Sequence, residues 1–420
     1  MSGASARFRS VRTRVFAAAF IGYAAYYLVR TNLSPIAKQF GETVGYDKSQ
    51  LGDLAMASGL AYGLGKLLLG ALSDRSNARW FMPVGLLLSA GCNVAFAHAS
   101  GFPMHLGLWA FNGFVQGMGW APCGRILAHW FGVSERGRAF GVWNVSHNLG
   151  GALVGPLAGF MAQSRGWQGA FYVPAALAGL VAIYLLAELR DTPESMGLES
   201  PEGDASSEKP DRPKRGKLWS LVLGNPWMWL LALANFFAYV LRYSLLDWGP
   251  TFLQEARGAT LMQGAWSTFV YEGAGLVSTL AFGWLTDRFG GRRALLGLAC
   301  LVPMAAAFGL LLFGPTGVPA LGIVLFGVVG FSIYPLLMLF TIIALELTSK
   351  EAIGAAAGFI GLFGYLGKGA QAKGLGWLAM HWGWNAALSA LGGVIAVELL
   401  LLVALWMRTE RAPALTVETA

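Results

Sequence analysis

The sequence predicts an all-α membrane protein with twelve transmembrane helices in two pseudo-symmetric six-helix halves. Of its 420 residues, 55% are hydrophobic and only 12% are charged, whereas roughly a quarter of the residues in a soluble domain are charged. The apolar residues are gathered into long stretches that can each cross a hydrocarbon layer of roughly 30 Å as a helix. Two short motifs of the first half recur in the second half. Together these observations exclude an ordinary soluble fold.

The predicted spans follow the apolar stretches in order. They cover residues 14–36, 51–72, 81–99, 104–131, 138–163, 168–188, 226–253, 262–285, 293–313, 319–345, 352–379 and 385–407. The first stretch follows an arginine-rich start but has no convincing cleavage site, so we expect a retained helix rather than a signal peptide. The 57 glycines fit close packing between membrane helices.

The net charge of +8 is explained by where the basic residues lie along the chain. If the N-terminus is cytosolic, most of them fall in cytosolic segments: Arg7, Arg9, Arg12, Arg14, Arg75, Arg79, Arg136, Arg138, Arg190, Lys209, Arg212, Lys214, Arg215, Lys217, Arg288, Arg292, Arg293, Lys350, Arg408 and Arg411. The opposite side has only Lys38, Lys48, Arg165 and Arg257. By the positive-inside rule, both termini are predicted to be cytosolic, and no nucleic-acid partner is implied.

Two motifs indicate an internal duplication. Gly70-Ala-Leu-Ser-Asp-Arg75 resembles Gly283-Trp-Leu-Thr-Asp-Arg288, and Tyr27-Leu-Val-Arg30 resembles Tyr239-Val-Leu-Arg242; the two spacings agree within one residue. We therefore predict an N-terminal half at 1–190, a cytosolic linker rich in Pro, Ser, Glu and Lys at 191–217, and a C-terminal half at 218–420.

This organisation resembles the major facilitator superfamily, in which two halves enclose a site near the middle of the membrane. The resemblance implies that the loop acids and arginines contact neighbouring helices when the cytosolic side is closed. We expect such a gating role for Asp74 and Arg75 and for Asp287 and Arg288. The alternative is that the arginines only orient the chain.

Charged residues inside the predicted spans indicate the ligand. The basic ones are Arg30, Lys66, Arg125, Arg242, Lys368 and Lys373, and the acidic ones are Asp247, Glu272 and Glu398. Each charge costs about 2.5–3.5 kcal/mol at a helix centre, so the excess of cations predicts a water-filled cavity that binds an anion. Glu398 has no role that we can assign. Asp247 and Glu272 are expected to pair with Lys66 or Arg125, either as static ion pairs or as pairs that break on substrate binding.

Arg30 and Arg242 are the leading candidates for binding phosphate, because the guanidinium group offers two parallel donors and keeps its charge. Arg30 alone could be a helix-end residue whose charge reaches the membrane surface, but its repetition favours a convergent pair. Tyr27 and Tyr239 precede the arginines by three residues and share their helical faces, as ligand donors or as packing aromatics.

His147 and Trp143 lie four residues apart in an unusually polar stretch, and we expect both to face the substrate. A histidine can become charged as a phosphate dianion arrives; a hydrogen-bonded core histidine is the alternative. The cysteines Cys92, Cys123 and Cys300 lie in separate spans, which predicts no disulfide and no metal site. No phosphate-binding glycine loop or nucleophile–base pattern occurs, so neither an enzyme nor a cofactor is predicted.

Several segments resemble one family of that superfamily, the organophosphate:phosphate antiporters. They are Gly22–Arg30, Gly117–Arg125, Trp143–Asn148, Leu241–Trp248 and Gly361–Gly367. The resemblance implies that Arg30 and Arg242 bind the phosphoryl group with help from His147, that Tyr365 lines the cavity, and that Lys66, Asp247 and Glu272 form a salt-bridge network. It also implies a bacterial inner-membrane location.

Two departures from the glycerol-phosphate carriers concern specificity. Thr31 stands where those carriers have lysine, and Lys368 and Lys373 stand where they have small neutral residues. We expect Lys368 to face the cavity and to favour a substrate with a second anionic group, such as a phosphoglycerate. The predicted function is exchange of an organophosphate for inorganic phosphate by a monomer in the lipid bilayer. A sugar-phosphate sensor acting with a partner kinase and a proton-driven carrier are the alternatives.

Overall fold

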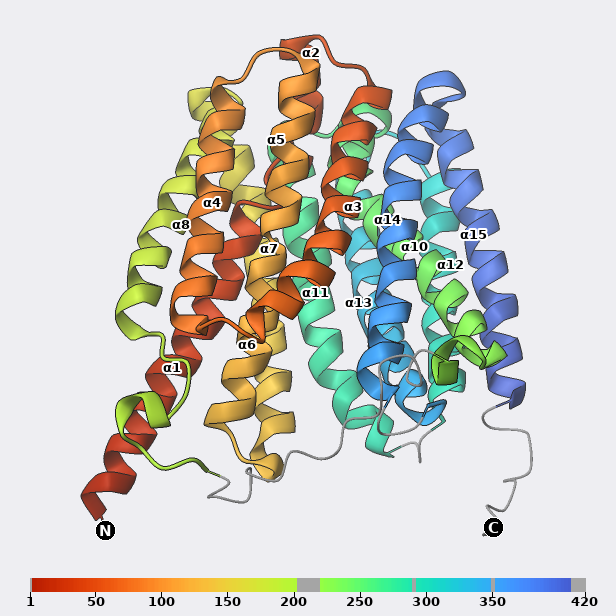
Figure 1. Ribbon diagram of the computed structural model, residues 1–420. Coiled ribbons are helices and arrows are strands. Elements are labelled where there is room, and N and C mark those ends of the chain that lie inside the picture. The colour runs from red at the N-terminus through yellow and green to blue at the C-terminus, as the bar shows by residue number, and fades with distance from the viewer. Residues whose placement is uncertain (1, 202–219, 289–291, 349–351, 409–420) are drawn as a thin grey trace.

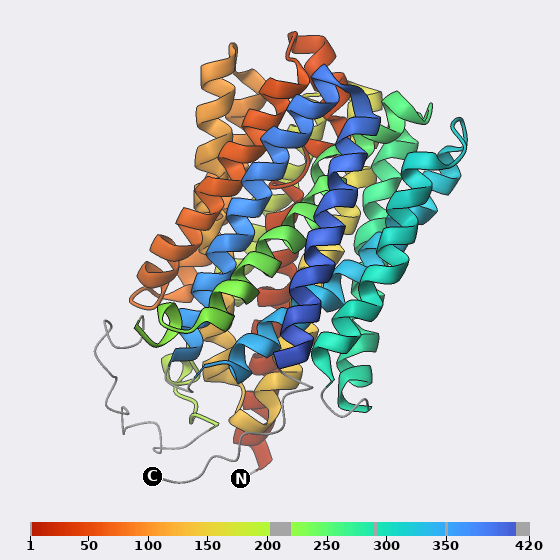
Figure 2. The same cartoon turned by 90° about the vertical axis from the view of Figure 1, so that its right-hand side faces the viewer.

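The computed structural model describes residues 2–201, 220–288, 292–348 and 352–408 (Figures 1 and 2). Side chains are described for these residues except 2–5, 283–288, 345 and 353. Asp287 and Arg288 therefore lie outside the described side chains, and most of the predicted linker lies outside the described residues. The described regular structure is helical.

The two halves of the chain form two groups of helices side by side (Figure 1). The first group contains α1 (Ser2–Leu28), η1 (Ser34–Ile36), α2 (Ala37–Val44), α3 (Lys48–Ser73), α4 (Ala78–His98), α5 (Phe102–Val115), α6 (Gly117–Trp130), α7 (Val133–Arg165) and α8 (Gly169–Glu188), followed by η2 (Glu194–Met196). The second contains α10 (Pro226–Ala256), α11 (Leu261–Arg288), α12 (Arg293–Phe313), α13 (Pro319–Glu346), α14 (Ile353–His381) and α15 (Gly383–Trp406).

Each predicted span corresponds to helix in the structure, but two predictions of an unbroken helix are wrong. The span predicted at 104–131 is divided at Gln116 into α5 and α6. The span predicted at 14–36 stops as an α-helix at Leu28 and is followed by non-helical residues and η1. Pro35 opposes continuation, because it has no N–H to bond the preceding turn.

The outer surface is apolar, as a lipid-facing surface requires. Seven of the described helices are long and apolar enough to cross a membrane by length and composition alone: α3, α4, α8, α10, α12, α13 and α15. Large apolar side chains such as Leu67, Phe313 and Leu400 are 61%, 86% and 69% exposed. This surface stabilises the fold in hydrocarbon rather than in water.

The halves meet where α3 packs on α14 and α7 packs on α11. Glycines permit these contacts: a Cβ at Gly52 would lie 2.6 Å from the carbonyl oxygen of Ala372, and one at Gly155 would lie 2.4 Å from that of Ala265. Gly52 lies in the first turns of α3, directly after α2, so this contact is near the end of the molecule that bears α2, opposite the end where α1 begins (Figure 1). We call the former the α2 end.

Candidate functional site

Arg30 stands just beyond the C-terminus of α1, on the side of the first half that faces the second. Its side chain is 7% exposed, and its guanidinium carbon lies 3.7 Å from the ring centroid of Tyr62 and 5.1 Å from that of Tyr27. Nη2 of Arg30 has no hydrogen-bond partner among the described residues. Because an unsatisfied buried donor costs about 1–3 kcal/mol, this N–H group is available to a ligand.

Arg242 lies within α10, which runs unbroken on both sides of it. Its side chain is 8% exposed, and Nη2 donates to the Tyr334 hydroxyl at 3.1 Å. The guanidinium carbon is 4.6 Å from the Tyr334 ring centroid and 5.1 Å from that of Tyr243. Nε has no partner within the described part of the chain, so Arg242 also has a free buried donor.

Tyrosine rings connect the two arginines across the boundary between the halves. Tyr62 contacts Tyr365 at 4.9 Å between centroids, Tyr365 contacts Tyr239 at 5.6 Å, and Tyr239 contacts Tyr243 at 5.6 Å. Arg30 lies over the first of these rings and Arg242 over the last. The structure therefore brings both arginines into one aromatic-lined site.

Sequence reasoning proposed Tyr27, Tyr239 and Tyr365 for this site but missed three other tyrosines. These are Tyr62, Tyr243 and Tyr334, all of which contact an arginine. Tyr62 could have been found, because it precedes the intramembrane Lys66 by four residues and so shares its helical face. Tyr334 gave no such signal, since its span has no charged residue near it.

His147 and Trp143 take different places on α7. The His147 ring lies between Tyr27 and Tyr334, at 5.7 and 5.9 Å between centroids, and its Nδ1 donates to the carbonyl of Asn144. That bond does not use Nε2, the other ring nitrogen. Trp143 is fully buried in the apolar cluster of the first half, where its ring is 4.8 Å from that of Tyr23. Packing accounts for the position of Trp143.

The expected ion pairs of Asp247 and Glu272 are not formed in the structure. Asp247 Oδ2 accepts from Gln371 Nε2 at 2.6 Å. Glu272 Oε2 accepts from Asn148 Nδ2 at 2.9 Å and from the Tyr334 hydroxyl. Neutral donors reach these carboxylates because α10 faces α14, and α11 faces α7 and α13.

Lys66 and Arg125, the cations proposed as partners of Asp247 and Glu272, contact other groups. Lys66 Nζ is 4.7 Å from the Trp120 ring centroid and 5.9 Å from that of Tyr365, and it has no carboxylate partner among the described residues. Arg125 instead makes a bidentate pair with Asp191, with Nε–Oδ1 at 2.9 Å and Nη2–Oδ2 at 2.8 Å. Sequence reasoning had not included Asp191, because it lies beyond the end of a predicted span.

The loop between α3 and α4 contacts the Arg125–Asp191 pair. Arg125 Nη1 donates to the backbone carbonyl of Asp74 at 3.0 Å, and Asp191 Oδ1 accepts from the backbone N–H of Ala78 at 3.0 Å. The side chains of Asp74 and Arg75 are exposed. The loop is thus held through its backbone, at the end where α1 begins.

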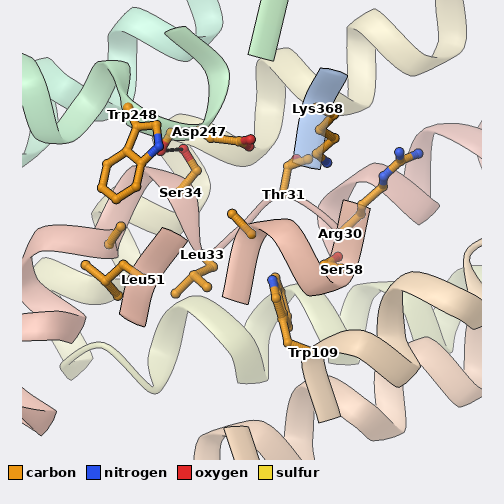
Figure 3. Close-up of a pocket in the computed structure, with 12 residues that line it drawn as sticks. Arg30, Thr31, Leu33, Ser34, Leu51, Ser58, Trp109, Asp247, Trp248 and Lys368 are labelled. Carbon is orange, nitrogen blue, oxygen red and sulfur yellow. Dashed lines mark hydrogen bonds between the residues drawn. The ribbon is translucent and has the colours of Figure 1, made fainter. Parts of the chain in front are cut away.

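Lys368 and Lys373, five residues apart on α14, contact different groups. Lys368 lines a pocket between the halves together with Arg30, Thr31, Ser34, Ser58, Asp247 and Trp248, among others (Figure 3). It is 5% exposed, and its Nζ lies 4.4 Å from the Tyr243 ring centroid, which Arg242 also contacts. Lys373 is paired with Asp53 of α3 at 2.7 Å, an acid that sequence reasoning had overlooked.

These placements change the charge balance expected from the sequence. Arg125 and Lys373 are neutralised by Asp191 and Asp53. Around the tyrosines, the cations Arg30, Arg242, Lys66 and Lys368 outnumber the carboxylates Asp247 and Glu272. Glu398 is fully buried on α15, and neither of its carboxylate oxygens has a partner among the described residues. The site between the halves is therefore cationic and suited to an anion.

The sequence of the chain matches the family described as Major Facilitator Superfamily over residues 19–371. The chain therefore belongs to this superfamily of membrane transporters. A solved D-xylose-proton symporter shares the fold, with a TM-score of 0.73 and 16% sequence identity over 93% of this chain and 97% of that chain.

Curated relatives narrow the class to the organophosphate:phosphate antiporter family, to which this chain belongs. It is 36% identical over 422 residues to a glycerol-3-phosphate transporter of Bacillus subtilis (strain 168), covering 97% of this chain and 95% of the relative. It is 36% identical over 433 residues to a probable hexose phosphate transport protein of Chlamydia pneumoniae, covering 96% and 93%. It is also 31% identical over 407 residues to the membrane sensor protein UhpC of Escherichia coli (strain K12), covering 94% and 93%. The resemblance predicted from the sequence is confirmed.

Proposed function

We propose that this chain is a secondary active transporter that exchanges a phosphorylated small metabolite for inorganic phosphate by alternating access. The observation that supports it is the pair of buried arginines, one from each half, that each keep an N–H group without a partner in the part of the chain that the structure describes. A phosphate can accept from both guanidinium groups, and their planar geometry suits its oxygens. Phosphate is held and carried rather than cleaved.

Exchange follows from the charge of the empty site. Closing the halves around the empty site is costly, because no anion then compensates the charges of Arg30, Arg242, Lys66 and Lys368. Binding of either phosphate or an organophosphate compensates the charge, and both can then drive the reorientation. The halves are joined at the α2 end, so access from the end where α1 begins fits this conformation.

The membrane placement follows the charge asymmetry. We propose that the chain works as a monomer in the inner, plasma membrane, with both termini cytosolic, because the sequence concentrates basic residues in the segments predicted to lie on the same side as the N-terminus. The two halves at 1–190 and 218–420 are the bodies that move, joined by the linker at 191–217. In this orientation the α2 end faces away from the cytosol.

Counterflow in liposomes tests the exchange. Vesicles containing the purified protein and loaded with phosphate should take up labelled glycerol phosphate or phosphoglycerate without ATP. Arg30→Lys and Arg242→Lys should each abolish uptake, because lysine cannot make the bidentate contact. Arg257→Lys is a matched control: Arg257 is equally buried, but its guanidinium donates to backbone carbonyls of Gly314 and Pro315. Exchange that survives in both site variants would disprove the assignment.

We also propose that the substrate has a second anionic group, because Lys368 contacts the same tyrosine ring as Arg242, that of Tyr243, and has no carboxylate partner among the described residues. Lys368→Ala should weaken phosphoglycerate uptake at least about tenfold more than glycerol phosphate uptake. Equal losses for both substrates would contradict this preference. The competing sensor function, favoured by the similarity to UhpC, predicts binding without any counterflow.

A further inference from the structure

The end of α1 lies deep inside the protein, where its last carbonyl groups have no water to bond. A helix that stops at membrane depth leaves carbonyls that cost several kcal/mol each unless protein groups bond them. Here side-chain amides from α4, from α5 and from the break between α5 and α6 do so. The Val29 carbonyl accepts from Asn93 Nδ2 at 2.8 Å and Asn112 Nδ2 at 2.9 Å, and the Tyr26 carbonyl accepts from Gln116 Nε2 at 3.2 Å.

With Asn32 and the hydroxyl of Ser89, these amides form one buried hydrogen-bonded network. We call its five residues the amide network: Asn32, Ser89, Asn93, Asn112 and Gln116. Ser89 donates to Asn112 Oδ1 and accepts from Gln116 Nε2, and Asn32 Nδ2 donates to Asn93 Oδ1 at 2.9 Å. All five residues are at most 2% exposed. Buried polar groups are usually bonded, because an unpaired one is costly. Asn32 Oδ1 has no partner among the described residues, but the bonds above hold the five side chains in one arrangement.

The non-helical segment that follows is bonded as well. Asn32 Nδ2 also donates to the Ala170 carbonyl at 2.8 Å; this carbonyl is free because Pro174, four residues later, has no N–H. On the other side, the Ser34 hydroxyl donates to the Leu246 carbonyl, which Pro250 leaves free in the same way. Residues on both sides of Arg30 are therefore hydrogen-bonded to other elements, before it through their carbonyl groups and after it through their side chains.

The described residues around Arg242 form no equivalent network. It lies within a continuous helix, and its carbonyl accepts from the Tyr271 hydroxyl at 3.1 Å. The two arginines match in sequence but not in backbone conformation. The direction of Arg242 is set by its own helix, whereas the direction of Arg30 depends on where α1 ends.

We propose that the amide network is a positioning device for the anion site: it ends α1 at Leu28 and thereby directs Arg30 toward the second half. The inference rests on the proposed role of Arg30 as a phosphate ligand. It makes Asn93, Asn112 and Gln116 positioning residues that act through Arg30 without touching the substrate.

Cysteine labelling tests the position of residue 30 without requiring transport. Arg30→Cys and Arg242→Cys are each made in full-length protein with Cys92, Cys123 and Cys300 replaced by alanine, and labelled with an anionic, water-soluble methanethiosulfonate. Asn112→Leu removes the bond to the Val29 carbonyl and the bond from Ser89. It should slow labelling at position 30 at least about tenfold, which is the factor expected for loss of one buried hydrogen bond. Labelling at position 242 should stay within about twofold.

Two further variants keep the test decisive. Asn235→Leu removes a buried amide that donates to the Ile360 carbonyl at 2.9 Å in the second half, and it should leave position 30 unaffected. Gln116→Met removes the bonds to Tyr26 and Ser89 but leaves both amide bonds to the Val29 carbonyl. It should also slow labelling at position 30, and it serves as the test variant if Asn112→Leu does not fold. Unchanged labelling at position 30, or equal slowing at positions 30 and 242, would overturn the proposal.

With both arginines intact, Asn112→Leu should raise the KM for organophosphate counterflow about tenfold while changing kcat less. Absence of counterflow in the unaltered protein would count against the proposed function alone, since the labelling result does not depend on it.

Discussion

Two ion pairs join the halves at the α2 end, and breaking both should open that end. Lys48 Nζ lies 3.0 Å from Glu255 Oε2, and Lys373 Nζ lies 2.7 Å from Asp53 Oδ2. Each pair links α3 of the first half with α10 or α14 of the second. The double variant Asp53→Asn, Glu255→Gln removes both charges at nearly constant side-chain volume, and glutamine can still accept from the indole of Trp384, as Glu255 does at 2.8 Å.

The size of the effect follows from the partial exposure of the pairs. Their side chains are 25% to 37% exposed, so solvent screens the charges and each pair contributes about 1 kcal/mol. Together they favour the closed α2 end by about 2 kcal/mol. Their loss should shift the equilibrium toward the state open at that end on the order of 30-fold.

Accessibility of the pocket reports this shift. Ala55 lines the pocket between the halves, and Ala55→Cys should react with a membrane-impermeant thiol reagent supplied from the α2 side only when that end is open. The double variant should react on the order of 30-fold faster. Glu42→Gln is the control, because Glu42 pairs with Lys38 of its own helix, at 3.9 Å. Unchanged reactivity in the double variant would refute the view that these pairs hold the halves together.

Three more predictions concern residues outside the two ion pairs at the α2 end. Asp191→Asn should lower the free energy of unfolding by about 1–3 kcal/mol, because it weakens the bidentate pair with Arg125; thermal melting in detergent measures this, and an unchanged melting temperature contradicts it. Gly155→Val should abolish exchange, since a Cβ there would meet the Ala265 carbonyl at 2.4 Å; Gly141→Val, with open space around it, is the control. Tyr62→Leu should raise the KM for phosphate about threefold to thirtyfold through loss of the cation–π contact with Arg30; an unchanged KM would remove Tyr62 from the site.

Local patterns predicted a large part of the architecture. Hydropathy located all the spans, since each must be apolar over its whole length. It could not locate the ends of helices within the protein: α1 stops at Leu28 although apolar residues continue. The residues that compensate this ending come from α4, α5 and the break between α5 and α6, and nothing near Leu28 in the sequence indicates them.

The candidate site shows the same division. Arg30, Arg242 and Lys368 were found because a charge is costly in hydrocarbon and so stands out in an apolar span. Their neighbours Tyr243 and Tyr334 were missed, because tyrosine is common in membrane helices as a packing residue. The partners of Arg125 and Lys373 were missed because Asp191 and Asp53 lie far from them along the chain.

The sequence by itself determined that this protein crosses the membrane repeatedly, that it is duplicated, and that each half contributes an arginine to a cationic interior. These properties depend on composition and on spacing along one helix, which are written locally. Only the tertiary structure decided which charges are neutralised and which face the cavity. It also decided that the two matching arginines differ in backbone conformation, Arg30 beyond the end of a helix and Arg242 within one. Those outcomes depend on contacts between helices distant in sequence, where a shift of a single turn gives each side chain a different partner.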